Sequence, residues 1–144
     1  GDVYKRQVQL PLSSRDLDER AKSGEFYNIL TGKSPERDIE IDRICEIIQM
    51  CSDAKIPAVK YNLNIIGIPR TESELGRGGA KLSTFNWENA DKNSSDTIAG
   101  KVSEDIFWER IEYFLDKVVP VAEENKIRLS SRYRPWRRIF FKCT

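Results

Sequence analysis

The chain has 144 residues with a formal net charge of +1, and it contains no histidine. That length suits one ordinary domain. The lack of imidazole, the commonest metal ligand and a common general base, excludes most hydrolase and metalloenzyme sites from these residues. No apolar run reaches the roughly 18 residues of a membrane span. Cys45, Cys51 and Cys143 lack the spacing of a zinc site, so we interpret them as reduced thiols of a cytoplasmic protein.

The first third of the chain predicts a strand, an irregular stretch and a helix. The strand is expected near 8–12, and the polar stretch 15–32 predicts a loop with some helical turns. Ser34 and Pro35 indicate a helix start, with Ser34 as N-cap and Pro35 at the first helical position. The helix is expected near 35–52, because apolar side chains recur there at three- and four-residue spacing: Ile41, Ile44, Cys45, Ile48 and Cys51.

A second strand is expected near 57–66. Polar residues interrupt its apolar run, which indicates that its C-terminal half faces a wet, ligand-sized space rather than a second apolar layer. Lys60 and Tyr61 point to opposite faces of this strand, so one lines the site and the other packs against a helix, and the sequence leaves open which. The stretch 67–101 is a long excursion. Its apolar and aromatic residues favour a packed flap: Leu82, Phe85 and Trp87.

A second long helix is expected near 103–125, with Ser103 as N-cap and a kink at Pro120. A third strand follows near 127–131. Strands that alternate with helices predict an α/β fold with right-handed crossovers and a parallel sheet. The buried face of this helix is expected to contain Phe107, Ile111, Phe114, Leu115, Val118, Val119 and Ala122.

Four polar residues form the candidate ligand site: Asn62, Asn64, Arg70 and Arg77. They lie at or beyond the C-terminal end of the second strand, where parallel sheets and barrels bind ligands. Amide and guanidinium groups suit a hydroxylated, anionic small molecule. Simpler interpretations stay open: the two Asn could satisfy backbone groups, Arg70 could be a solvated surface charge, and the glycines of 76–79 could form a flexible turn.

Three long segments carry a resemblance to a known family. They are IPAVKYNLNIIGIPRT (56–71), GRGGA (76–80) and EDIFWERIEYFLDKVVPVAEENKIRL (104–129). Through them the chain resembles mannonate dehydratase, a sugar-acid lyase among the TIM barrels similar to xylose isomerase. The resemblance covers about 8–129. A whole barrel takes about 250 residues, so we expect a partial TIM (β/α)8 barrel with about three parallel strands and two main helices, as a fragment.

The resemblance implies a cytoplasmic enzyme of carbohydrate metabolism, in hexuronate catabolism. The intact enzyme would dehydrate D-mannonate to 2-keto-3-deoxy-D-gluconate with a divalent metal, manganese or iron, whose ligands are not in this chain. Relatives carry His near the position of Ser13 and Cys near that of Lys60, so a related isomerase or epimerase is the alternative. We expect a sugar acid as partner and no membrane, and a homo-oligomer is an open option for the intact protein. The chain alone is expected to be inactive.

The two ends differ from the rest. Residues 2–7 (DVYKRQ) look like a translated adaptor, which predicts a non-native leader over 1–7. Residues 128–144 hold six Lys or Arg and no Asp or Glu. We interpret 130–144 as an out-of-frame tail behind a partial barrel domain over 8–129. The alternative is that its alternating basic and aromatic residues bind single-stranded nucleic acid, which salt-dependent binding of an oligonucleotide would reveal.

Overall fold

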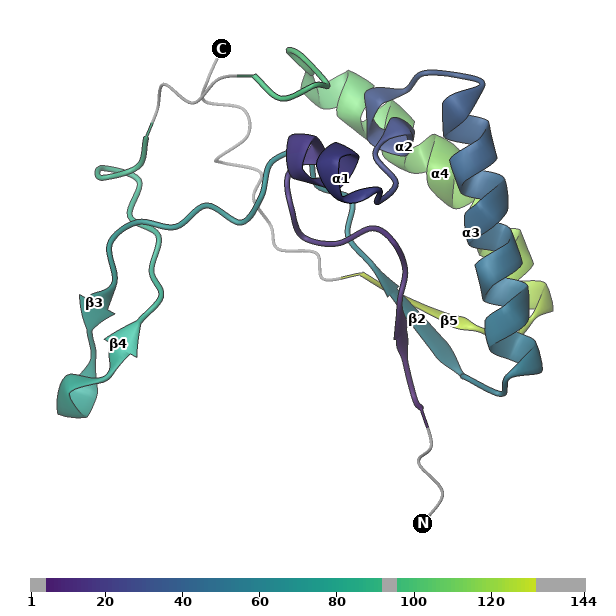
Figure 1. Ribbon diagram of the computed structural model, residues 1–144, viewed down its shortest axis with the longest axis horizontal. Helices are drawn as coiled ribbons and strands as arrows, with labels where there is room; N and C mark the ends of the chain where they lie inside the picture. The colour runs from purple at the N-terminus through teal and green to yellow at the C-terminus, as the bar shows by residue number, and fades with distance from the viewer. Residues whose placement is uncertain (1–4, 92–95, 132–144) are drawn as a thin grey trace.

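Three short parallel strands form the centre of the computed structural model, which describes residues 5–91 and 96–131. They are β1 (Val8–Gln9), β2 (Ala58–Tyr61) and β5 (Arg128–Ser131), in the spatial order β1-β2-β5 (Figure 1). Val59 pairs with Val8 on one side and with Leu129 on the other. The predicted parallel α/β sheet is therefore confirmed. Most of the predicted leader and tail lies outside the described residues, at 1–4 and 132–144.

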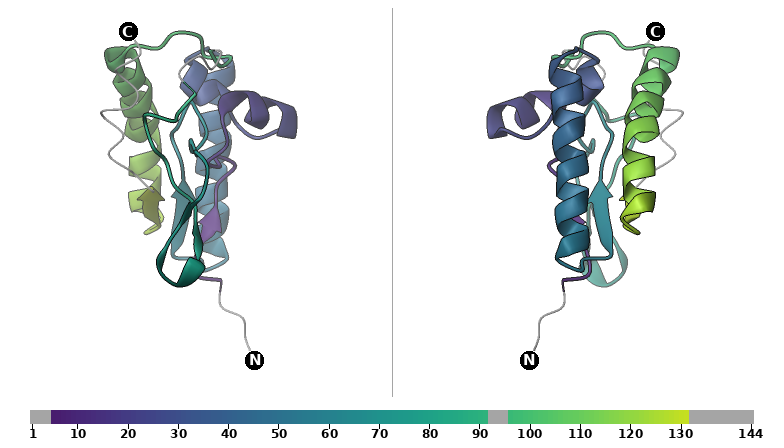
Figure 2. Two further views of the ribbon diagram at one scale, coloured as in Figure 1. Left: turned by 90° about the vertical axis from the view of Figure 1, so that its left-hand side faces the viewer. Right: turned by 90° about the vertical axis from the view of Figure 1, so that its right-hand side faces the viewer.

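Two long helices, α3 (Glu36–Asp53) and α4 (Glu104–Glu124), run side by side over one face of the sheet (Figure 2). Both crossovers bring their helix to the same face, as right-handed connections require. Tyr61 of β2 packs on Phe114 of α4, with ring centroids 5.6 Å apart. The core between sheet and helices includes Leu10, Leu12, Ile41, Ile44, Ile48, Val59, Phe114, Val118 and Ala122.

The helix boundaries agree with the expectations, but one cap does not. Ser103 caps α4 as predicted, because its hydroxyl accepts from the Ile106 N–H at 3.3 Å. The prediction of Ser34 as N-cap of α3 is wrong, since Pro35 holds that position without a side-chain cap bond. The Ser34 hydroxyl instead donates to the Asp38 carboxylate at 2.6 Å. The helix α4 runs through Pro120 to its end at Glu124.

The connection from β1 to α3 contains two short helices, α1 (Leu17–Ser23) and α2 (Asn28–Thr31), in the stretch expected to form helical turns. The strands β1 and β2 are both shorter than predicted. The strand β2 ends at Tyr61 rather than near 66, because from Asn62 onward the chain bonds to the loop after β1. The Asn62 N–H donates to the Leu12 carbonyl at 3.0 Å, and the Leu17 N–H donates to the Ile65 carbonyl at 3.1 Å.

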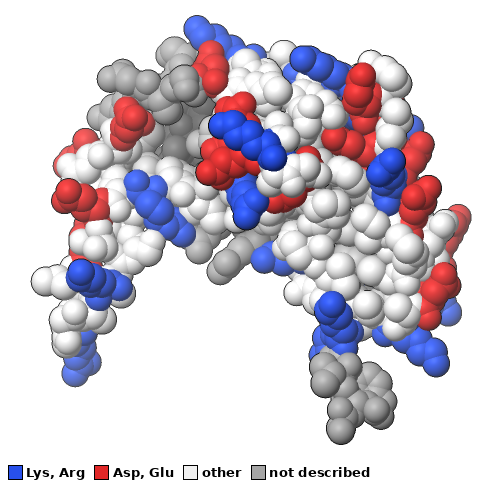
Figure 3. Space-filling view, in the orientation of Figure 1, with Lys and Arg blue, Asp and Glu red and all other residues white. Residues whose placement is uncertain are grey.

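An antiparallel hairpin extends from the other side of the molecule. It consists of β3 (Glu74–Leu75), the 3-10 turn η1 (Arg77–Gly79) and β4 (Lys81–Leu82), and we call residues 71–84 the arm. The space-filling view shows a broad hollow between the arm and the sheet (Figure 3). Leu75 and Leu82 are 74% and 50% exposed. Leu82 is therefore half exposed rather than packed on the body of the protein, unlike the packed flap expected for it.

Among the described ranges, no helix combines the length and apolar character needed to cross a membrane.

Candidate functional site

The loops that follow β1 and β2 meet at the carboxyl edge of the sheet, and one buried arginine joins them. Arg20, on α1, has a fully buried side chain. Its Nη2 donates to the Ser13 carbonyl, to the Asn62 carbonyl at 3.3 Å and to Asn64 Oδ1 at 2.8 Å. We call these four residues the Arg20 clamp. Because the clamp ties both loops to one side chain, it fixes their positions at the carboxyl edge of the sheet.

The two asparagines of the predicted site are largely occupied by backbone groups. Asn64 Nδ2 donates to the Ile66 carbonyl at 2.7 Å and to the Arg15 carbonyl at 3.0 Å, while its oxygen accepts from Arg20. Asn62 Nδ2 donates to the Leu12 carbonyl at 3.2 Å. These bonds agree with the interpretation that the asparagines satisfy backbone groups, and they place both residues at the end of β2 as expected.

Burial shapes the electrostatics of Arg20. Desolvation lowers the pKa of Arg20 to about 10, while the nearby carboxylates of Glu25, Asp16 and Glu40 act in the opposite direction. The guanidinium is thus still charged at neutral pH. Its Nε and Nη1 are buried and have no hydrogen-bond partner within the described part of the chain. Sequence reasoning missed Arg20; the available signal was its place three residues after Leu17, which puts both on one helix face.

Glu25 supports the same loop from the other side. Its carboxylate accepts from the Ser13 N–H at 3.1 Å and from Arg15 Nη1 at 3.3 Å. Burial opposes ionisation of Glu25, but the bonds from Ser13 and the charges of Arg15 and Arg20 outweigh it, so the pKa is below its ordinary value. The loop after β1 is therefore held by charged groups of both signs.

The two predicted arginines lie away from the clamp. Arg70 is exposed and its Nη1 donates to the Pro69 carbonyl at 3.2 Å. Arg77 is exposed at the free end of the arm, where Gly78 and Gly79 have φ of 71° and 78°. That left-handed backbone favours glycine, so the glycines shape the hairpin turn. The structure brings Asn62 and Asn64 together but does not bring Arg70 or Arg77 to them.

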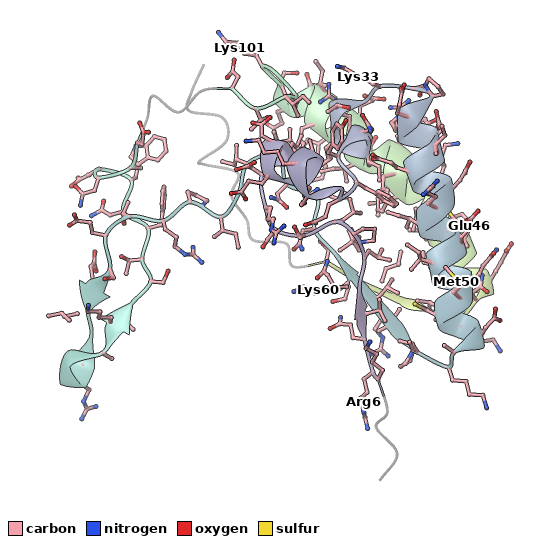
Figure 4. All side chains as sticks on the ribbon, in the orientation of Figure 1. Arg6, Lys33, Glu46, Met50, Lys60 and Lys101 are labelled. Atoms are coloured by element: carbon pink, nitrogen blue, oxygen red, sulfur yellow. The ribbon has the colours of Figure 1, made fainter. Side chains whose placement is uncertain are left out.

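A row of polar residues crosses the face of the sheet that the long helices leave open. Gln9 of β1, Lys60 of β2 and Ser130 of β5 are register partners, and we call them the inner row. Since side chains alternate along a strand and Tyr61 packs against α4, Lys60 faces the opposite side. Figure 4 shows Lys60 pointing away from α3 and α4. The open choice between Lys60 and Tyr61 is thereby decided: Lys60 faces the open side.

The described residues do not fit the divalent metal that the family resemblance implies. Residues 5–91 and 96–131 contain no group of three or more His, Cys, Asp or Glu side chains that could hold a metal ion. The inner row offers an amide, an ammonium and a hydroxyl. An ammonium repels a cation, and Mn²⁺ or Fe²⁺ prefers carboxylate and imidazole ligands.

Comparison with known proteins supports the fold. No family model matches the sequence. The structure is similar to part of the crystal structure of mannonate dehydratase from Streptococcus suis serotype 2, with a TM-score of 0.60 and 18% sequence identity. The match covers 88% of this chain and 46% of that protein, so the chain spans under half of its length. At this identity the likeness shows a shared α/β fold, with the three-stranded open sheet matching part of a barrel.

Proposed function

We propose that this chain forms part of a sugar-acid dehydratase that acts on D-mannonate. The observation that carries the proposal is the fold match to part of a mannonate dehydratase, over 88% of the chain. The family-like segments at 56–71 and 76–80 support it, because they supply the loop after β2 and the arm. The position of the clamp and the inner row also supports it, since parallel α/β folds bind ligands at the carboxyl ends of their strands.

The proposed reaction removes one molecule of water. The proton on C2, next to the carboxylate, and the hydroxyl on C3 leave, and a C2–C3 double bond forms. The resulting enol gives up the proton of its C2 hydroxyl and takes up a proton at C3, which gives 2-keto-3-deoxy-D-gluconate. A site for this reaction must hold the carboxylate and the hydroxyls in one orientation. We assign the described residues to that task of binding and orientation.

The metal implied by the resemblance has no fitting ligand group in the described residues. No step of the proposal is therefore attributed to a metal held by this chain. The 144-residue chain alone is expected not to dehydrate D-mannonate.

The test is a product assay with two proteins. A full-length homologue that contains the YNLNIIGIPR and GRGGA segments is incubated with D-mannonate, and the purified 144-residue chain is treated in parallel. We expect 2-keto-3-deoxy acid from the homologue and none from the chain alone. Interconversion of aldose and ketose sugars without loss of water would favour the isomerase alternative, and no reaction with any sugar acid would contradict the proposal.

A further inference from the structure

We propose that the inner row is a binding site for an aldonic acid, with Lys60 pairing with the carboxylate and Gln9 and Ser130 contacting hydroxyl groups. The inference rests on the proposed function for its substrate class, and it adds the residues that recognise the substrate. It also assigns recognition of the anion to the centre of the sheet rather than to Arg70 or Arg77, the arginines of the sequence-based site.

The first argument is the lack of a charge partner for Lys60. The ion pairs formed by residues 5–91 and 96–131 join Arg15 with Glu25, Arg37 with Glu109, and Lys117 with Asp38. None of them includes Lys60. Lys60 is a partly buried residue of the middle strand, and with no ion-pair partner among the described residues its ammonium is available to an anion.

The second argument is the chemistry of its neighbours. Gln9 and Ser130 lie beside Lys60 in parallel register. The Ser130 hydroxyl offers a donor and an acceptor, and the Gln9 amide offers its oxygen as an acceptor, because its nitrogen donates to backbone carbonyls; both suit the hydroxyl groups of a sugar acid. Gln9 already reaches along this face, because its Nε2 donates to the Lys60 carbonyl at 3.1 Å and to the Leu12 carbonyl at 3.0 Å.

The third argument is size. Neighbouring strands lie about 4.8 Å apart, so a row across three strands spans about 10 Å. That length accommodates an extended six-carbon acid, with its single carboxylate at one ammonium. A polyphosphate would call for several cations, and the row has one. A divalent cation is disfavoured by the same ammonium.

The fourth argument compares Lys60 with the arginines of the sequence-based site. Arg70 and Arg77 are exposed. Water and salt screen an exposed charge strongly and a half-buried charge less. Lys60 also belongs to the hydrogen-bonded sheet, where its carbonyl accepts from the Leu10 N–H at 2.8 Å. Because Lys60 is less exposed than Arg70 and Arg77 and its backbone is fixed in the sheet, we expect a ligand charge to gain more from Lys60.

The test measures binding to the full 144-residue chain by ligand-observed NMR. The ligands are D-mannonate, D-gluconate and the neutral polyol D-mannitol. The variants are Lys60→Gln, Lys60→Arg and the matched control Lys33→Gln, an exposed lysine at a distance from the sheet (Figure 4). We expect Lys60→Gln to weaken D-mannonate binding at least tenfold, Lys60→Arg to retain it within a few fold, and Lys33→Gln to leave it unchanged. Binding of D-mannitol should not respond to Lys60→Gln.

Three results would overturn the inference. They are absence of aldonate binding to the wild-type chain, equal binding by Lys60→Gln and wild type, and equal weakening by Lys60→Arg and Lys60→Gln in variants whose circular dichroism is native. The readout is independent of turnover. Lysine-dependent binding of D-gluconate or D-mannonate would therefore support the inner row even if the homologue failed to dehydrate D-mannonate, and that failure would count against the proposed function alone.

Discussion

The body of the protein and the arm are built from similar short, apolar-containing segments, yet they differ sharply in burial. Val59 of β2 and Phe114 of α4 are fully buried, whereas Leu75 of β3 is 74% exposed. The body has a helical layer over its sheet, while the arm is a two-stranded hairpin. An isolated hairpin of this kind has little stability of its own. The comparison teaches that a second layer, rather than β-propensity, decides which apolar residues stabilise this fold.

The strongest test of this difference pairs one apolar truncation from each region. We expect Phe114→Ala to reduce the free energy of unfolding by about 3–5 kcal/mol, because it removes a buried ring and leaves a cavity. Leu75→Ala, the arm's counterpart, should change it by less than about 0.5 kcal/mol. Urea denaturation followed by circular dichroism measures both. Similar losses for the two variants would show that the arm packs on the body.

A second pair compares arginines. Arg20→Met leaves the Ser13 and Asn62 carbonyls without their buried donor, and we expect a loss of about 2 kcal/mol in the free energy of unfolding. The loss is limited because the variant also removes a desolvated charge. Arg77→Met on the arm should be neutral within about 0.5 kcal/mol. A stabilised Arg20→Met variant would mean that the desolvation of the guanidinium outweighs its bonds to the loops.

The sequence-based site gives a prediction that separates activity from stability. With Lys60 on the carboxylate, Arg70 or Arg77 is left to contact the hydroxyl end of the substrate. In the full-length homologue, replacing the residue equivalent to Arg70 or Arg77 with Ala should lower kcat/KM by about 30-fold, equivalent to about 2 kcal/mol. Thermal stability should stay within a few degrees. The variant equivalent to Asn62→Ala should lose activity and also some stability, because its amide holds the Leu12 carbonyl. Normal turnover in all three variants would show that the segment from Asn62 to Arg77 has a purely structural role.

The smallest expected effect concerns pH and the contact between α3 and α4. Hydrogen bonds from Ser34 and Tyr113, with the charges of Lys117 and Arg37, hold the pKa of Asp38 below its ordinary 3.8. Because the folded pKa is the lower one, this stabilisation is present above pH 3.8 and is lost as the pH falls through the folded value. The Tm of Asp38→Asn should therefore lie below that of wild type at pH 7 and converge with it in acid. A control variant in the arm, Glu74→Gln, should match wild type throughout. A constant difference in Tm for Asp38→Asn would exclude the ionic contribution.

The sequence predicted those parts of the fold that depend on local periodicity. The apolar stripes of α3 and α4, the Ser103 cap and the parallel sheet all follow from spacing along the chain. The end of β2 was missed, because it is set by the Leu12 carbonyl, some fifty residues earlier. Ser34 is not the cap because Pro35 occupies the N-cap position of α3, which leaves Ser34 one residue before it.

The candidate site was less predictable because it also depends on contacts between residues that are far apart in the sequence. Asn62 and Asn64 were predicted as site residues from their place at the C-terminal end of the second strand, and the structure places them at the end of β2. Arg20 was missed because its partners come from two distant loops. The row formed by Gln9, Lys60 and Ser130 requires the register of three strands. The sequence alone does not reveal that these three residues are neighbours.

The Arg20 clamp has a consequence for how the molecule opens. Since one side chain holds both loops, neither can detach without breaking bonds of the other, and the two behave as one cooperative unit in local unfolding. Two backbone hydrogen bonds bridge the same two loops. The Asn62 N–H donates to the Leu12 carbonyl, and the Leu17 N–H donates to the Ile65 carbonyl. We therefore expect both amides to exchange through a single opening event, in which the two loops are released together.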